Sequence, residues 1–242
     1  MNEHVPLHLQ TVGVADAAKS GALEPRLLLE GVAKTWPKQD VPLFAHISLE
    51  LQPGTLAVVT GRNGVGKTTL LRIVAGLISP DAGVVRLDGL SPGENRRDYH
   101  RRIGFLSAGS AGLYARLTVG QHLQYWGRLA MLPAAHVRSR VAATLELFEL
   151  GAIADRRADR LSMGQRQRLR IALAFLHEPS LLVFDEPWSS LDGDALELLR
   201  AVTADFGAQG GCGLFSVPTG QELEVVSADR IFVMENGGLR PL

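Results

Sequence analysis

A nine-residue stretch, Gly61-Arg62-Asn63-Gly64-Val65-Gly66-Lys67-Thr68-Thr69, has the residue types and spacing needed to bind phosphate. It follows the pattern G-x-x-x-x-G-K-[ST]. Its glycines allow a tight turn, so that several backbone N–H groups can point at phosphate oxygens. Lys67 would reach the β- and γ-phosphates of a nucleotide, and the Thr68 hydroxyl would bind Mg²⁺. The stretch therefore predicts a phosphate-binding P-loop.

The flanking segments are suited to position this turn. An apolar run, Leu56 to Val59, precedes it and predicts a strand, whereas Leu70 to Ala75 has apolar residues at helical spacing. A helix that begins near Lys67 would add its positive N-terminal end to the site. A chance glycine-rich turn with a solvated lysine is the alternative, but the strand and helix on either side argue against it.

Two carboxylates follow another apolar run. Leu181 to Phe184 predicts a strand that ends at Asp185 and Glu186. In P-loop enzymes, such a strand places its aspartate beside Mg²⁺, which assigns Asp185 as a metal ligand with Thr68. Glu186 would orient or deprotonate an attacking water, a general-base role. Many strands end in acidic turns, so the pattern is informative mainly because a P-loop precedes it.

A third segment, Leu161-Ser162-Met163-Gly164-Gln165, precedes a helix with apolar residues on one face. Ser162 and Gln165 have capping-box spacing, which alone predicts only a helix start. A helix N-terminus with a serine hydroxyl can also form a second phosphate-binding surface.

Together, these segments resemble the ATP-binding-cassette (ABC) ATPases. The P-loop, a signature that reads LSMGQ where the family has LSGGQ, and the strand with two carboxylates occur in family order, followed by the D-loop-like Ser189-Ser190-Leu191-Asp192. The resemblance covers nearly all of residues 27–240. It implies a two-lobed subunit that dimerises head to tail, with ATP between the P-loop of one subunit and the signature of the other. It also implies that Trp36 stacks on adenine. A buried tryptophan without a ligand is the alternative there.

Two polar groups that the family usually places near the γ-phosphate are absent. The family's glutamine follows the strand that matches residues 103–106, where Ala108 lies closest to the expected place. The family's histidine follows the strand that matches 214–217, where Pro218, or Thr219 with a shifted gap, stands instead. Proline offers no side-chain hydrogen bond. Because phosphoryl transfer depends on positioned charge and water, we expect intact ATP binding and slow hydrolysis. Met163 replaces one signature glycine, and we expect this change to be tolerated.

Strands alternate with helices along most of the chain, which predicts a mainly parallel sheet covered on both faces. With the resemblance, the expected fold is α/β: a P-loop NTPase with a RecA-like sheet, a small antiparallel β part and an α-helical subdomain. We expect a flexible extension at residues 1–26 and a single ATPase domain at 27–242. Its core would comprise 27–108 and 178–242, and the helical subdomain about 109–177.

Composition limits the range of functions. The chain has 242 residues and a formal net charge of zero, so nothing points to a nucleic-acid partner. One cysteine, Cys212, lies in an apolar run, as expected of a small core residue in a reducing compartment. No apolar run approaches the about 18 residues of a membrane span, and the N-terminus lacks a secretory signal. We therefore expect a cytoplasmic protein, peripheral on the inner face of the cell membrane through a partner.

Three functions remain open. The first is the ATPase subunit of a transporter, which works with a separate membrane-spanning subunit as a homodimer or heterodimer. The run from Gly112 to Thr118 resembles exporter-type subunits and suggests export. The second is a regulatory or structural cassette that completes the site of a more active partner. The third, a non-transport ABC protein acting on nucleic acid or the ribosome, is disfavoured by the single cassette and zero net charge. A basic cluster at residues 96–102 suggests a solvated face or a contact with an acidic partner.

Overall fold

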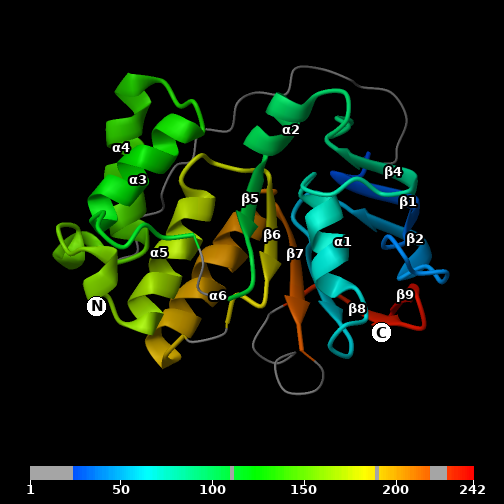
Figure 1. Ribbon diagram of the computed structural model, residues 1–242. Helices are drawn as coiled ribbons and strands as arrows, with labels where there is room; N and C mark the ends of the chain where they lie inside the picture. The colour runs from blue at the N-terminus through cyan, green and yellow to red at the C-terminus, as the bar shows by residue number, and fades with distance from the viewer. Residues whose placement is uncertain (1–23, 110–111, 189–190, 219–227) are drawn as a thin grey trace.

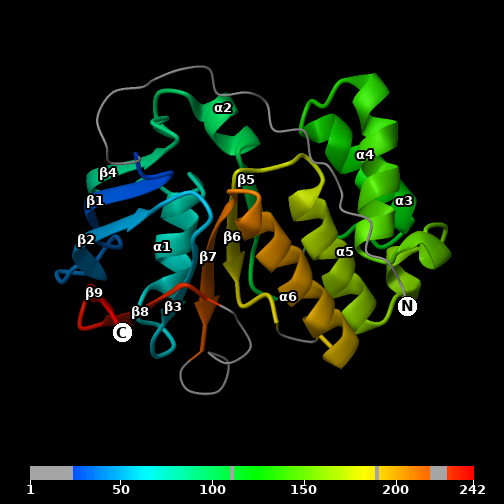
Figure 2. The same cartoon turned by 180° about the vertical axis from the view of Figure 1, so that it is seen from behind.

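The computed structural model describes residues 24–109, 112–188, 191–218 and 228–242. Most of the predicted N-terminal extension lies outside these residues, as does a short helix that the sequence suggests near Glu222. In both views, α3 and α4 lie at one end of the molecule and a small sheet at the other, with a larger sheet between them (Figures 1 and 2).

The larger sheet has six strands in the order β5-β6-β7-β3-β8-β9. The first five run parallel, and β9 pairs antiparallel with β8. The strands are β3 (Leu56–Thr60), β5 (Ile103–Leu106), β6 (Leu181–Asp185), β7 (Cys212–Val217), β8 (Arg230–Glu235) and β9 (Gly238–Pro241). Because β7 lies between β6 and β3, the segments that follow these three strands meet at one edge of the sheet.

The smaller sheet is antiparallel, with the strand order β2-β1-β4. Its strands are β1 (Leu27–Lys34), β2 (Phe44–Leu51) and β4 (Ala82–Leu87). The predicted α/β fold, with a mainly parallel sheet and a small antiparallel part, is confirmed.

Six α-helices complete the described part of the chain. They are α1 (Lys67–Val74), α2 (Arg96–Arg101), α3 (Val119–Leu129), α4 (Ala134–Leu147), α5 (Met163–Phe175) and α6 (Gly193–Ala208), with short 3₁₀ turns at Gly151–Ile153 and Ala158–Arg160. The helices α3, α4 and α5 pack together, and α5 also packs on β5. This helix therefore connects the helical end of the molecule to the larger sheet.

Side-chain alternation in β3 divides the core into two layers. Leu56 and Val58 pack with α3 to α6 on one face of the larger sheet. Ala57 and Val59 pack with α1 and the small sheet on the other face. Strand side chains alternate between faces, so a strand buried on both sides reads as continuously apolar. Cys212 belongs to the second layer and is fully buried with a free thiol, as expected of a core residue.

The basic cluster forms α2, which the sequence analysis did not predict as a helix. Tyr99 fixes its position: the ring is fully buried, and its hydroxyl donates to the carbonyl oxygen of Val74 at 2.6 Å. Arg102, at the end of the helix, pairs with Asp88 at 2.8 Å. Arg96, Arg97 and Arg101 are exposed, as a solvated face requires, and together with the half-buried His100 they line a groove described below.

Candidate functional site

The P-loop connects β3 to α1 and packs tightly against neighbouring strands. Gly61 and Gly66 have φ angles of 149° and 117°, in the region that favours glycine. A Cβ atom on Gly61 would overlap the carbonyl oxygen of Met234 in β8, and one on Gly66 would lie 2.9 Å from Phe44 Cδ1. The two glycines therefore meet both a conformational and a steric requirement.

Lys67 is the first residue of α1, and its side chain turns back over the loop. Its Nζ donates to the carbonyl oxygens of Gly61 at 2.5 Å and Arg62 at 3.3 Å, and the residue is only 6% exposed. Burial lowers the pKa of Lys67, while the negative charges of Glu186 and Asp185 act in the opposite direction. The two carboxylates thus help to keep this ammonium group charged beside the loop.

Thr68 and Asp185, which are distant in the sequence, lie side by side. The Thr68 hydroxyl donates to Asp185 Oδ2 at 2.8 Å, and Asp185 is 3% exposed. A hydroxyl and a carboxylate are hard oxygen ligands, and Mg²⁺ commonly takes one or two carboxylates plus phosphate oxygens and water. Among the residues that the structure describes, no group of three or more His, Cys, Asp or Glu side chains could hold a metal ion. Mg²⁺ at this pair would therefore need phosphate oxygens and water as further ligands. The pair therefore fits Mg²⁺ bound together with a nucleotide.

Ser216 organises both carboxylate residues, and sequence reasoning missed it. Its hydroxyl donates to Asp185 Oδ1 at 2.5 Å and accepts from the backbone N–H of Glu186 at 3.1 Å. Glu186 has a φ of 51°, so the chain turns sharply where β6 ends. The available sequence signal was one hydroxyl in the otherwise apolar strand Cys212–Val217.

The two positions at which the sequence departs from the family pattern both follow strands of the larger sheet. Ala108 is exposed just beyond β5. Pro218 directly follows β7, and its carbonyl oxygen accepts from the Thr60 hydroxyl at 3.4 Å. Since Gly61 follows Thr60, position 218 lies beside the start of the P-loop and presents no side-chain donor there. Thr219, the alternative in a shifted alignment, lies outside the described residues.

The signature segment forms the start of α5. Ser162 caps the helix: its Oγ accepts from the Gln165 N–H at 3.2 Å, and Gln165 Oε1 accepts from the Ser162 N–H at 3.1 Å. The predicted capping box is therefore present. Leu161 is buried and anchors the segment, whereas Ser162 and Met163 are exposed at the surface.

Two other parts of the predicted site are the loop that contains Asp192 and the residue Trp36. Asp192 caps α6, because its Oδ1 accepts from the Ala195 N–H at 2.9 Å, and Leu191 beside it is partly buried. Ser189 and Ser190 of the same predicted loop lie outside the described residues. Trp36 is 37% exposed, with Lys34 Nζ at 5.6 Å from its ring centroid, so it is not a core residue.

The site can be compared with known proteins on this basis. A family profile described as "ABC transporter" matches residues 44–189. The chain belongs to this family. It is 32% identical over 200 residues to the ABC transporter ATP-binding protein NatA of Bacillus subtilis. This match covers 83% of the chain and 81% of NatA. It therefore carries an ABC-type ATPase domain.

Further relatives are longer proteins. A spermidine/putrescine import ATP-binding protein, PotA of Thermobifida fusca, is 34% identical over 93% of this chain and 59% of its own length. A sulfate/thiosulfate import ATP-binding protein, CysA of Gloeobacter violaceus, is 39% identical over 72% of this chain and 50% of its own length. The chain thus spans only half to three-fifths of the length of these two relatives.

Solved structures agree with the fold. A structure of an ATP-binding subunit of an ABC transporter superposes with a TM-score of 0.79 at 25% identity, covering 89% of this chain and 90% of the other. A dimeric ATP-binding cassette in a post-hydrolysis state, with bound ADP and phosphate, superposes with a TM-score of 0.76 at 23% identity. At that identity, the second likeness supports the fold alone.

Proposed function

We propose that this chain binds and slowly hydrolyses ATP as the cytoplasmic subunit of a transporter whose membrane-spanning part is a separate chain. The observation that carries the proposal is the cluster in which Lys67, Thr68, Asp185 and Glu186 surround one end of the P-loop. No helix among the described residues is long and apolar enough to cross a membrane. A partner would therefore supply the transport path.

Each residue of the cluster has a distinct task in this proposal. The loop N–H groups and Lys67 bind the β- and γ-phosphates of ATP, and Trp36 stacks on the adenine. Thr68 and Asp185 hold Mg²⁺, which neutralises charge on the phosphate oxygens. Glu186 orients the attacking water and accepts its proton. Ser216 holds Asp185 and Glu186 in place through its two hydrogen bonds.

We expect slow hydrolysis because two positions near the γ-phosphate lack polar side chains. Ala108 and Pro218 cannot donate side-chain hydrogen bonds to the charge that develops there. Binding depends on the P-loop, which is complete, so ATP affinity should be ordinary while turnover is low.

A second subunit completes the site in this proposal. In both views the start of α5, which carries the signature, lies well to the side of α1 and the P-loop (Figures 1 and 2). The signature residues Ser162, Met163 and Gly164 are therefore available to the nucleotide of another cassette in this proposal. A cassette of similar fold has been solved as a dimer, which is the kind of arrangement proposed here. The partner is a second copy, or a more active cassette for which this chain serves a regulatory role.

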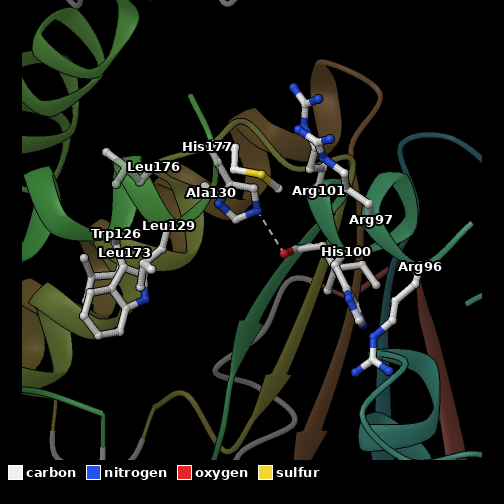
Figure 3. A pocket seen from close by; sticks show the side chains of 12 residues that line it. Arg96, Arg97, His100, Arg101, Trp126, Leu129, Ala130, Leu173, Leu176 and His177 are labelled. Atoms are coloured by element: carbon white, nitrogen blue, oxygen red, sulfur yellow. Dashed lines mark hydrogen bonds between the residues drawn. The ribbon is translucent and has the colours of Figure 1, made fainter. Parts of the chain in front are cut away.

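A groove between α2 and the helical end offers a surface for the membrane subunit. It has a volume of about 560 Å³ and two chemically different walls, which Figure 3 shows on opposite sides. One wall is basic: Arg96, Arg97, His100 and Arg101. The other is apolar: Trp126, Leu129, Ala130, Leu173 and Leu176. His177 closes the floor, where its Nε2 lies 3.0 Å from the carbonyl oxygen of Ile103. These walls suit an amphipathic segment with acidic residues along one side.

Reversing the charge of the basic wall should abolish capture of the membrane subunit. We expect the Arg97→Glu/Arg101→Glu variant to lose a membrane-spanning protein that copurifies with the wild-type chain from detergent extract, because acidic side chains would then face acidic ones. ATP affinity should stay within about twofold, since the groove does not contain the P-loop. The control is Arg138→Glu on the exposed side of α4, outside the groove. Equal capture by all three proteins, or recovery of nucleic acid alone, would contradict this assignment.

Ser216 should matter for both stability and hydrolysis. Replacing it with alanine would remove the hydroxyl that accepts from the Glu186 N–H and donates to Asp185. We expect the free energy of unfolding to fall by about 1–3 kcal/mol, and the ATP-cleavage rate to fall about tenfold because the glutamate is less well held. Thermal unfolding and ATPase assays would measure the two effects. Ser139→Ala, which removes an exposed hydroxyl bonded to the His136 carbonyl, is the matched control. An unchanged cleavage rate would show that Ser216 is only structural.

A further inference from the structure

Arg170 is a buried cation that donates to neutral carbonyl, amide and hydroxyl oxygens rather than to a carboxylate. It lies on α5, is 6% exposed, and makes no ion pair in the described part of the chain. One terminal nitrogen donates to the Ser107 carbonyl oxygen at 2.7 Å and to its hydroxyl at 3.4 Å. The other donates to the carbonyl oxygen of Gly109 and to Gln167 Oε1, the latter at 2.7 Å. The planar fork of a guanidinium suits this set of acceptors.

Gln167, one turn earlier on α5, extends the contact toward the catalytic segment. It is buried, and its Nε2 donates to the Pro187 carbonyl oxygen at 2.8 Å. Pro187 directly follows Glu186. Since a guanidinium only donates and a carbonyl only accepts, the amide has one orientation that satisfies both neighbours. A continuous path of hydrogen bonds therefore runs from the loop at 107–109, through α5, to the residue after the glutamate.

We propose that Arg170 and Gln167 are positioning residues for ATP hydrolysis, which fix the loop at 107–109 relative to the segment that carries Glu186. The inference rests on the proposed function. The two side chains hold the loop by hydrogen bonds, which the methyl group of Ala108, at the centre of the same loop, cannot make. Placement of the glutamate by this path matters because a displacement of about 1 Å can cost about 10²-fold in rate.

The same residues also border the proposed docking groove. A smaller hollow of about 280 Å³ is lined by Ser107, Gly112 and Arg170. It shares Trp126, Leu173 and His177 with the groove. The groove and the hollow that Arg170 lines therefore adjoin along these shared residues.

The variant Gln167→Glu distinguishes positioning from plain stabilisation. Its carboxylate can still accept from Arg170, and would pair with the buried charge, but it has no N–H to donate to Pro187. We expect the single-turnover rate of ATP cleavage to fall about tenfold, with the ATP dissociation constant within twofold of wild type. Arg170→Met should lose a similar factor, and the double variant should be no slower than the slower single variant, because both changes break one path.

The controls separate the outcomes. Arg168→Met lies on the same helix and removes an ion pair with Glu149 at 3.1 Å, so its cleavage rate should be unchanged. If Arg170→Met fails to fold, Gln167→Glu decides, since it leaves the arginine paired. A folded Gln167→Glu protein that cleaves ATP within twofold of wild type would overturn the inference, as would loss of ATP affinity in step with the rate. Complete absence of cleavage by the wild-type chain would overturn the proposed hydrolysis together with the inference.

Discussion

Glu186→Gln is expected to lower the rate of ATP cleavage by about 10²-fold or more while ATP affinity stays within about twofold. The two side chains have nearly the same shape, and the backbone N–H of residue 186 keeps its bond to the Ser216 hydroxyl. The change removes the negative charge of residue 186 and, with it, the capacity to accept a proton from water. Lys67 and Thr68 remain in place, so the phosphate-binding half of the site is intact. Single-turnover cleavage of labelled ATP and equilibrium nucleotide binding would measure the two quantities separately.

A matched change tests whether the loss is specific to this carboxylate. Glu197 is an exposed glutamate on α6, away from the P-loop, and Glu197→Gln should leave both quantities unchanged. A Glu186→Gln protein that cleaves ATP at the wild-type rate would show that another group handles the proton. Because wild-type turnover is itself expected to be slow, the assay must follow the reaction long enough to resolve the difference.

The sequence could predict that Thr68 and Asp185 belong to one site, but not the strand order that brings them together. Each residue lies at the end of a recognisable element, and carboxyl ends of parallel strands share one edge of a sheet. The order that places β7 between β6 and β3 could not be read from the strands themselves. All three are buried on both faces, so their continuous apolar runs carry no information about their neighbours. Ser216 was missed for this reason: its role depends on which strand lies beside β6.

Charged residues on α5 show a second limit of sequence reasoning. Arg168 and Arg170 are two positions apart and look equally like surface residues. In the structure, Arg168 pairs with an exposed glutamate, whereas Arg170 is buried against the loop after β5. Burial of an arginine depends on acceptors supplied by distant backbone, and no local pattern encodes them. The helix α2 was missed because six residues are too few to reveal a helical period.

The suggestion of export remains a prediction from the sequence around Gly112. Two relatives named as importers share 34% and 39% identity with this chain. In the proposed arrangement, the path for the substrate belongs to a separate membrane subunit. In this proposal the partner sets the direction of transport, and a transport assay with the partner would measure it.

Pro218→His is expected to raise the rate of ATP cleavage about tenfold or more. The carbonyl oxygen of residue 218 accepts from Thr60, the residue before the P-loop, so a longer side chain at this position would start beside the first residues of the loop. An imidazole there would supply a donor to the charge that develops on the γ-phosphate. A single well-placed donor of this kind is worth about 10²–10³-fold in other enzymes. A smaller gain is expected here because the surrounding residues have not been shaped around an imidazole.

Pro218→Ala distinguishes the donor from the release of a rigid ring. Alanine removes the fixed proline backbone without adding a hydrogen-bonding group, so this variant should stay as slow as wild type. If alanine and histidine raise the rate equally, backbone freedom at the end of β7 would be the limiting factor. If neither does, the slow step lies elsewhere, and Ala108→Gln becomes the informative change. A gain with histidine alone would show that the P-loop and its carboxylates are competent, and that turnover is limited by a missing contact to the γ-phosphate.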